Sequence, residues 1–240
     1  MSQLLLDIAP HTLPTLDNFV VGRNLELLSA LRHSLAGNTS ERCFYIWGES
    51  GSGKSHLLQA CVNAAHVMQQ QAVYVHGSAL PQVMDMSAAL VAVDDVEQLV
   101  ASAPNGDAAQ TGLFNLYNQM RDSGAMLLVS GKESPLHLKL RDDLRTRLGW
   151  GLVYQLHVLS DEEKAQALLQ HAHSRGLVLS AEVTQYLLRH GRRDLPSLMA
   201  VLDALDEHSL RLHRAPSVPL LKEVMQQKTS AQLLRSPILR

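Results

Sequence analysis

The octapeptide GESGSGKS occupies residues 48–55 and decides the fold of this chain. It fits the pattern G-x-x-x-x-G-K-[ST], in which a glycine-rich loop directs its backbone N–H groups toward phosphate oxygens. The apolar run CFYIW at 43–47 predicts a buried strand before the loop, and HLLQACV at 56–62 predicts a helix after it. Because the motif requires this order, the stretch predicts an α/β fold with a phosphate site. A glycine-rich turn with an accidental Lys-Ser pair is the alternative, which this context disfavours.

Each part of this loop has a distinct expected role. The glycines permit a turn that other residues resist, and the N-terminus of the following helix adds partial positive charge. Lys54 can reach the outer phosphates of a nucleotide, and the hydroxyl of Ser55 can ligate Mg²⁺. The predicted nucleotide-binding residues of this stretch are Gly48, Gly51, Ser52, Gly53, Lys54, Ser55 and His56.

A second apolar run, ALVAVDD at residues 89–95, ends in two carboxylates. Continuous apolar runs are typical of parallel strands whose sheet is covered by helices on both faces. Carboxylates at the C-terminal end of such a strand lie in the crevice where open α/β sheets bind ligands. We expect Asp94 to hold Mg²⁺ through water and Asp95 to orient or deprotonate the attacking water. An ordinary turn with two aspartates is the alternative, disfavoured by the P-loop about 40 residues upstream.

The remaining patterns complete a two-part architecture. The predicted strands cover residues 72–76, 125–130 and 152–156, and the predicted helices before the last strand cover 25–35, 112–122 and 138–145. One strand ends at Ser130, which either touches the γ-phosphate or the water, or is simply a satisfied serine. From Ser160, which forms a capping box with Glu163, the pattern is helical only. Helices are expected at 160–175, 180–190, 194–213 and 220–227.

These expectations divide the chain into four parts. The α/β nucleotide-binding domain is expected at 19–158, with a parallel sheet flanked by helices, and a small all-helical lid at 159–227. An extended segment is expected at 1–18, and a loose tail at 228–240.

Composition narrows the class of protein. The chain has 240 residues, 46% of them apolar, which is enough for a packed core. Residues 1–120 carry 4 Lys+Arg and 10 Asp+Glu, a net −6, whereas residues 121–240 carry 17 and 13, a net +4. Cys43 and Cys61 lie in apolar segments and predict free thiols in a reducing compartment, and no metal-ligand spacing is present. Without a transmembrane run or a signal peptide, we expect a cytoplasmic protein with no membrane partner.

The P-loop, the Asp-Asp strand, the polar strand end and the helical lid together resemble an AAA+ module of the DnaA-like branch. FVVGRN at 19–24 is similar to the F-x-x-G-x-N motif of that branch, which lies by the adenine and implies a nucleotide contact at Val21. RTRLGWGL at 145–152 is similar to its box that carries the arginine finger, at Arg147. RDL at 193–195 is similar to its sensor 2, at Arg193, and Ser130 falls at sensor 1.

DnaA initiators carry a C-terminal helix-turn-helix domain of roughly a hundred residues, which we do not expect here because the sequence ends just after the lid. QLLLDI at 3–8 is similar to the terminal peptide of the short regulatory branch, the Hda family. The resemblance implies that the chain binds ADP or ATP with Mg²⁺, docks on the beta-subunit sliding clamp of DNA polymerase III and promotes hydrolysis of DnaA-bound ATP. The residues expected to contact the clamp are Gln3, Leu4, Leu6 and Ile8; a terminal strand that pads the core is the alternative.

Two other functions fit part of the sequence. A DNA-binding or helicase-loading AAA+ ATPase is permitted by the basic second half, but no aromatic-rich or Lys/Arg-dense stretch supports it, so DNA is expected at most indirectly. A kinase-type P-loop enzyme is disfavoured by Arg147 and Arg193, which suit a site shared between subunits. Asp95 stands where many AAA+ proteins have Glu, and its shorter side chain predicts weak hydrolysis by the chain itself. Formation of a homo-oligomer is left open.

Overall fold

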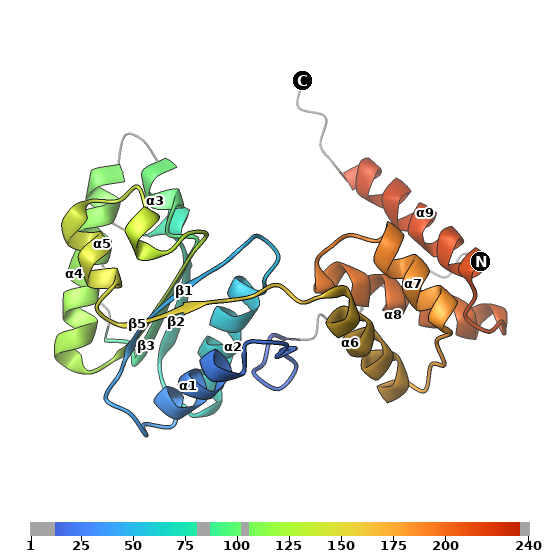
Figure 1. Cartoon of the computed structure of the whole chain (residues 1–240), viewed down its shortest axis with the longest axis horizontal. Coiled ribbons are helices and arrows are strands. Elements are labelled where there is room, and N and C mark those ends of the chain that lie inside the picture. The colour runs from blue at the N-terminus through green and yellow to red at the C-terminus, as the bar shows by residue number, and fades with distance from the viewer. Residues whose placement is uncertain (1–12, 81–86, 102–105, 236–240) are drawn as a thin grey trace, which may run out of the picture. The chain divides into compact units, whose positions relative to one another are not determined.

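The computed structural model describes residues 13–80, 87–101 and 106–235, which form two compact units (Figure 1). The boundary between the units lies between His157 and Val158, one residue before the predicted boundary.

The first unit alternates strands and helices along the chain. Its described strands are β1 (Cys43–Trp47), β2 (Ala72–His76), β3 (Leu90–Asp94), β4 (Met126–Gly131) and β5 (Leu152–Gln155). Its described helices are α1 (Leu25–Leu35), α2 (Lys54–Val67), α3 (Gln98–Ala101), α4 (Gly106–Ser123) and α5 (Asp142–Leu148), with 3₁₀ turns η1 (Gly77–Ala79) and η2 (Pro135–His137).

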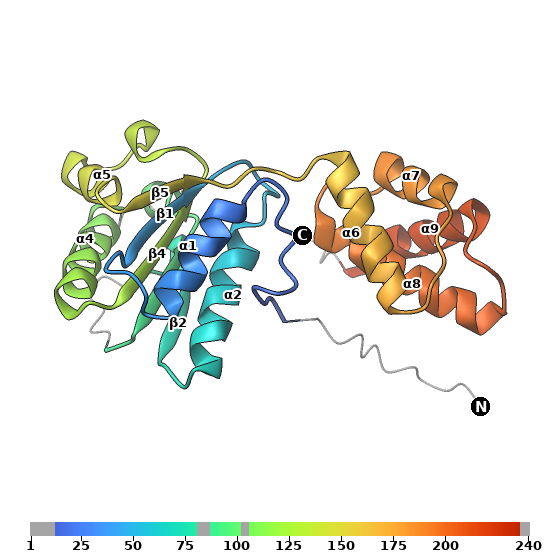
Figure 2. The ribbon, with the colours of Figure 1, turned by 60° about the horizontal axis from the view of Figure 1, so that its bottom comes forward.

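The strands form one parallel sheet in the order β2-β3-β4-β1-β5. Both faces are covered: α1 and α2 lie on one face, and α4 and α5 on the other (Figure 2). Side chains of β1 alternate between the two cores, since Phe44 and Ile46 pack toward α1 and α2, whereas Tyr45 packs toward α4. This arrangement confirms the predicted α/β fold. It also brings the C-terminal ends of β1, β3 and β4 to one edge of the sheet.

The predicted helix at 138–145 is wrong in position. Leu138 and Leu140 are buried in a non-helical segment, and the helix α5 begins only at Asp142. Arg141 is extended, and Asp142 and Asp143 supply the negative charge that favours a helix N-terminus. The segment before α5 therefore buries both leucines in the core, and the helix begins only after them.

The second unit contains only helices among its described residues. They are α6 (Asp161–Ser174), α7 (Ala181–His190), α8 (Leu195–Leu212) and α9 (Val218–Arg235). The predicted capping box is confirmed, because Ser160 Oγ accepts from the Glu163 N–H at 3.2 Å and Glu163 Oε2 accepts from the Ser160 N–H at 2.7 Å. The core consists mainly of leucines on facing helices, including Leu168, Leu187, Leu202 and Leu221, together with Val183 and Val224.

The predicted loose tail from residue 228 is wrong over its first eight residues, because α9 continues to Arg235. The stretch lacks apolar periodicity, but Gln, Lys, Ala, Leu and Arg are good helix formers and no Gly or Pro interrupts them. Helix α4 likewise starts at Gly106, six residues before the predicted start. No helix in the described part of the chain is long and apolar enough to cross a membrane.

Candidate nucleotide-binding site

The glycine-rich loop joins β1 to α2 at the C-terminal edge of the sheet. Gly51 and Gly53 have φ values of +81° and +101°, a left-handed conformation that side chains other than glycine rarely adopt. A Cβ at Gly48 would lie 2.3 Å from the carbonyl oxygen of Leu156, so the close approach of these two backbones also requires glycine. Helix α2 begins at Lys54, immediately after the turn, which directs its first N–H groups into the loop.

Lys54 lies over this loop and is 7% exposed. Its Nζ donates to the carbonyl oxygens of Gly48 at 2.7 Å and Glu49 at 2.9 Å. Burial lowers the pKa of Lys54, although Asp95 and Asp94 act in the opposite direction. An ammonium that bonds only to neutral carbonyls can exchange these bonds for stronger ones to an anion.

Ser52 provides a second polar group in the loop. Its Oγ is buried and has no hydrogen-bond partner within the described residues. A buried hydroxyl without a partner is costly, so a native structure needs a reason for it. A phosphate oxygen in the loop would supply the missing partner.

Asp94 at the end of β3 is 1% exposed and is held by hydroxyl groups on three sides. Ser130 Oγ donates to its Oδ1, and the Tyr74 hydroxyl donates to its Oδ2 at 2.5 Å. Burial works to raise the pKa of Asp94, but hydrogen bonds from Ser130, Ser55 and Tyr74 outweigh it, so the pKa lies below the ordinary value. The carboxylate is therefore ionised and oriented at neutral pH.

The structure thus brings together four of the predicted residues: Lys54, Ser55, Asp94 and Ser130. Ser130 links the two aspartates, since its Oγ also accepts from the Asp95 N–H at 3.0 Å. Both of its predicted alternatives, a site residue and a satisfied strand-end serine, fit this geometry.

Tyr74 belongs to none of the predicted site motifs, because the pattern at residues 72–76 predicts only a strand. Burial and the hydrogen bond to Asp94 raise the pKa of Tyr74 to about 12, so its hydroxyl remains a donor. The strand order places β2 next to β3, and the sequence carries no signal for that adjacency. The only indication in the sequence is the hydroxyl group of Tyr74 itself, which needs a hydrogen-bond partner within an otherwise apolar strand.

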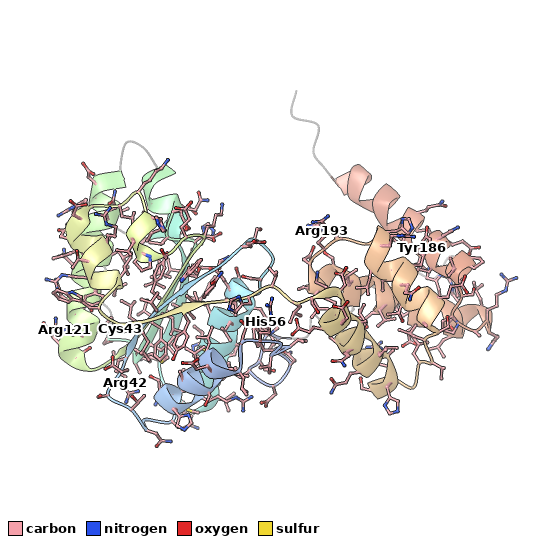
Figure 3. All side chains as sticks on the ribbon, viewed as in Figure 1. Arg42, Cys43, His56, Arg121, Tyr186 and Arg193 are labelled. Carbon is pink, nitrogen blue, oxygen red and sulfur yellow. The ribbon has the colours of Figure 1, made fainter. Side chains whose placement is uncertain are left out.

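The motif at 19–24 packs against the start of α2. The Phe19 ring lies 3.3 Å from the position that a Cβ at Gly53 would occupy, and its centroid is 5.8 Å from the ring of His56. His56 Nε2 lies 2.9 Å from Asn18 Oδ1, at the N-terminal end of α2 (Figure 3). Val21 is half-buried and packs on the core beneath. Phe19 therefore lies beside the glycine-rich loop and the predicted residue His56, and the predicted residue Val21 packs against the same core cluster as Phe19.

Comparisons with known proteins identify the family of this chain. The family model for the Hda lid domain matches residues 161–225, and the model for the bacterial DnaA ATPase domain matches residues 11–87. An uncharacterized protein of Haemophilus influenzae is 36% identical over 220 residues, which cover 88% of this chain and 93% of the relative. The chain belongs to the Hda-like, DnaA-related AAA+ proteins.

Solved structures share the fold of this Hda-like chain. Domain III of the Thermotoga maritima replication initiation protein DnaA has a TM-score of 0.69 at 20% identity, over 89% of this chain and 95% of that one. AMPPCP-bound DnaA from Aquifex aeolicus has a TM-score of 0.70 at 20% identity, over 92% of this chain and 71% of that one. The Thermotoga maritima RuvB Holliday junction branch migration motor has a TM-score of 0.64 at 15% identity, over 89% of this chain and 71% of that one. The chain spans only 65% of a further match, a DNA replication initiation factor, with a TM-score of 0.69 at 22% identity over 82% of this chain.

Arg147 of the Hda-like chain lies in α5 and contacts three aromatic rings. Its guanidinium carbon is 4.4 Å from the ring centroid of Phe114, 5.2 Å from that of Trp150 and 5.8 Å from that of Tyr117. Within the described residues Arg147 forms no ion pair. An ordinary surface arginine would pair with Asp143 or another carboxylate, but among the described residues Arg147 has no such pair, and Asp143 pairs with Arg141 at 2.7 Å.

The remaining predicted residues do not belong to the described part of the first unit. Arg193 belongs to the second unit, where it is exposed in the loop just before Asp194, the N-cap of α8 (Figure 3). Pro196 occupies the first turn of that helix, as its missing N–H allows. The residues expected to contact the clamp, Gln3, Leu4, Leu6 and Ile8, fall outside the described residues.

Proposed function

We propose that this Hda-like chain binds ADP or ATP in the loop at 48–55. The observation that carries the proposal is the ionised, buried Asp94, held by Ser55 and Ser130 at the loop that contains Lys54. The N–H groups at the start of α2, the Lys54 ammonium and the unpartnered Ser52 hydroxyl all suit phosphate oxygens. The Aquifex aeolicus relative, whose structure contains AMPPCP, supports an adenine nucleotide as the ligand.

Mg²⁺ would be held by the Ser55 hydroxyl and, through water, by Asp94. Within the described residues no group of three or more His, Cys, Asp or Glu side chains could hold a metal ion. Mg²⁺ suits such a place because it keeps several waters and takes one or two protein oxygens together with phosphate oxygens. The bound ion would neutralise charge on the outer phosphates, while Asp94 stays fixed by Tyr74 and Ser130.

We propose further that the chain regulates replication initiation by promoting hydrolysis of ATP bound to DnaA, with Arg147 as the arginine finger acting in trans. A half-buried guanidinium that has no carboxylate partner among the described residues supports this role, since its charge is available for a partner's phosphates. Its neighbours Arg141 and Arg145 are each neutralised by an aspartate. Docking on the sliding clamp through Gln3, Leu4, Leu6 and Ile8 belongs to the same proposal and rests on the resemblance of the terminal peptide.

The test is a reconstituted hydrolysis assay with ATP-loaded DnaA, the DNA-loaded sliding clamp and this full chain with ADP or ATP. We expect DnaA-bound ATP to be hydrolysed faster only when clamp and chain are both present. Deletion of residues 1–8 is expected to abolish the stimulation and to leave the melting temperature unchanged. A large loss of stability would instead favour a terminal strand that pads the core. Direct binding to duplex DNA with a steep salt dependence, without any effect on DnaA, would favour the DNA-binding alternative.

A further inference from the structure

A hollow in the second unit belongs to none of the predicted sites. It has a volume of about 400 Å³ and lies between α7 and the start of α9. Its lining residues are Glu182, Gln185, Tyr186, Arg189, His190 and Val218. Those from α7 follow one another at helical spacing, so they form one face of that helix. Val218 is the one aliphatic residue of this lining, so the hollow suits a polar partner.

Polar groups gather around the ring of Tyr186, which is labelled in Figure 3. The ring centroid of Tyr186 is 4.2 Å from that of His190, and the Lys222 Nζ lies 5.2 Å from it. An ammonium near the face of an aromatic ring is attracted to the ring electrons. Tyr186 therefore holds Lys222 of α9 at the hollow that Arg189 and His190 of α7 line.

Two cations of this region have no carboxylate partner within the described residues. Arg189 and Lys222 are both exposed, and neither forms an ion pair with a described residue. Arg192, just after α7, is by contrast paired with Asp194 at 3.1 Å. The charges of Arg189 and Lys222 are therefore available to a partner.

The carboxylates of the same two helices do not cancel these charges. Glu182 lines the hollow, but it precedes Arg189 by seven residues, which is about 10 Å along the helix axis. Glu223 follows Lys222 directly, and consecutive residues of a helix do not face the same way. The hollow is therefore positive at the end where α7 stops.

Helix dipoles explain only part of this arrangement. Arg189 and His190 lie in the last turn of α7, where a positive charge is favourable. Lys222 lies near the N-terminal end of α9, where the dipole disfavours a cation. The position of Lys222 therefore needs a reason other than the stability of its own helix.

We propose that Arg189, His190 and Lys222, gathered around Tyr186, form a basic face that binds the phosphate backbone of duplex DNA. Arg and Lys side chains make many of the contacts that proteins form with phosphate oxygens, and the Tyr186 hydroxyl can add a donor. Such contacts carry no sequence information, so we expect weak binding that does not depend on base sequence. Because the residues come from two helices, no Lys/Arg-dense stretch marks this face in the sequence.

This proposal rests on the proposed docking on the DNA-loaded clamp. A chain docked there lies next to duplex DNA, at an effective concentration that makes a few phosphate contacts sufficient. An acidic protein segment would offer the same charge. Protein partners are usually anchored by apolar or aromatic side chains in pockets, however, and Val218 alone offers little to receive them, so DNA is favoured.

The test measures binding of a fluorescent duplex oligonucleotide to the full chain at about 50 to 200 mM salt, without clamp. We expect the affinity to fall with a log–log slope of about −2 to −3, as for two or three phosphate contacts. Arg189→Ala and Lys222→Ala should each weaken binding and reduce the slope by about 1. Lys164→Ala is the matched control, because Lys164 pairs with Asp161 on α6 at 3.7 Å. Glu182→Gln should strengthen binding, a gain that loss of folding cannot produce.

Two results would overturn the basic face. One is a salt slope in Arg189→Ala and Lys222→Ala equal to that of the parent chain, and the other is tighter binding of poly-glutamate than of the duplex. In the hydrolysis assay with clamp and DnaA, the variant with both substitutions should need several-fold more chain for half-maximal stimulation, at an unchanged maximal rate. Failure of the parent chain to stimulate DnaA would refute the proposed function instead, and duplex binding without clamp would still decide the role of the basic face.

Discussion

The side chain of Asn24 forms two hydrogen bonds with the backbone of His157, which lies 133 residues further along the chain. Asn24 Nδ2 donates to the His157 carbonyl at 3.1 Å, and Asn24 Oδ1 accepts from the His157 N–H at 2.8 Å. Asn24 is 4% exposed and is the last residue of the motif at 19–24, whose Phe19 packs on the glycine-rich loop. His157 is the last residue of the first unit. The motif beside the loop is therefore bonded directly to the point where the chain leaves for the second unit.

Replacement of Asn24 by Ala should destabilise the first unit. It would leave the N–H and carbonyl of His157 without their partners, at a cost of about 1–3 kcal/mol. We expect a lower free energy of unfolding in urea, and faster amide exchange at residues 156–158. Asn24→Asp should recover only part of the loss, because a carboxylate accepts from the N–H but repels the carbonyl. Asn38→Ala, at an exposed position, is the control; equal stability of Asn24→Ala and this control would contradict the prediction.

Replacement of Lys54 by Ala tests the phosphate site. In the parent chain we expect ADP or ATP with Mg²⁺ to raise the melting temperature, because a ligand that binds only the folded state stabilises it. Lys54→Ala should abolish that shift, since the ammonium over the loop is removed. Lys132→Ala is a control for lost positive charge, because Lys132 lies after β4, outside the loop. An unchanged nucleotide affinity in Lys54→Ala would contradict the assignment of this loop as the phosphate-binding site.

The Tyr74 hydroxyl should matter to the Mg²⁺-dependent part of nucleotide binding. Tyr74→Phe removes the bond to Asp94 Oδ2, and hydrogen bonds to charged groups are worth about 1.5–3 kcal/mol. We expect weaker binding with Mg²⁺ and little change when Mg²⁺ is chelated. Tyr154→Phe, which removes a hydroxyl from the edge strand β5, should behave as the parent. Equal Mg²⁺ dependence in the two variants would show that Tyr74 only supports the fold.

The lowered pKa of His56 leads us to expect that the stability of the fold depends on pH. Burial beside Phe19 lowers the pKa of His56, although a hydrogen bond with the backbone of Thr15 opposes the shift. The unfolded chain therefore binds a proton more readily than the folded chain, and stability rises with pH in this range. We expect the contribution of His56 to be complete above about pH 6.5 and to be lost as the pH falls through the lower pKa of the folded state. The melting temperature of His56→Gln, measured between pH 5 and 8, should fall less steeply toward acid than that of the parent.

The sequence was sufficient for the local elements with the strongest patterns. The strands at 43–47 and 72–76 and the helix at 25–35 begin and end at the predicted residues. Apolar runs between turn residues define such elements without reference to the rest of the chain. Lys54 and Asp94 were also predictable, because each belongs to a local motif whose residue types and spacing are set by phosphate and Mg²⁺ binding.

The remaining features depend on neighbours in space. The partner of Asp94 in β2, Tyr74, follows from the strand order, which no local pattern encodes. The start of α5 was misplaced because burial of Leu138 and Leu140 overrides helix propensity in that segment. The stacking of Arg147 on Phe114 joins two helices that are far apart in the sequence.

Arg147 carries the regulatory part of the proposed function. Arginine fingers in other phosphoryl-transfer systems are worth about 10³–10⁵ in rate. Arg147→Ala should therefore remove the stimulation of DnaA-bound ATP hydrolysis while nucleotide binding and clamp binding by this chain stay intact. Arg147→Lys should also fail, because an ammonium lacks the planar fork of donors that two phosphate oxygens can accept.

Arg145 supplies a matched control, because it lies two residues away in the same helix and pairs with Asp142 at 2.8 Å. Surface ion pairs of this kind contribute about 0–1 kcal/mol, so Arg145→Ala should keep both the fold and the stimulation. Phe114 and Trp150 hold the Arg147 guanidinium through their rings, so Arg147→Ala also removes a packing contact. Unfolding in urea measures that loss separately. Full stimulation by a folded Arg147→Ala chain would exclude the finger, and with it a direct action on the nucleotide of DnaA through this residue.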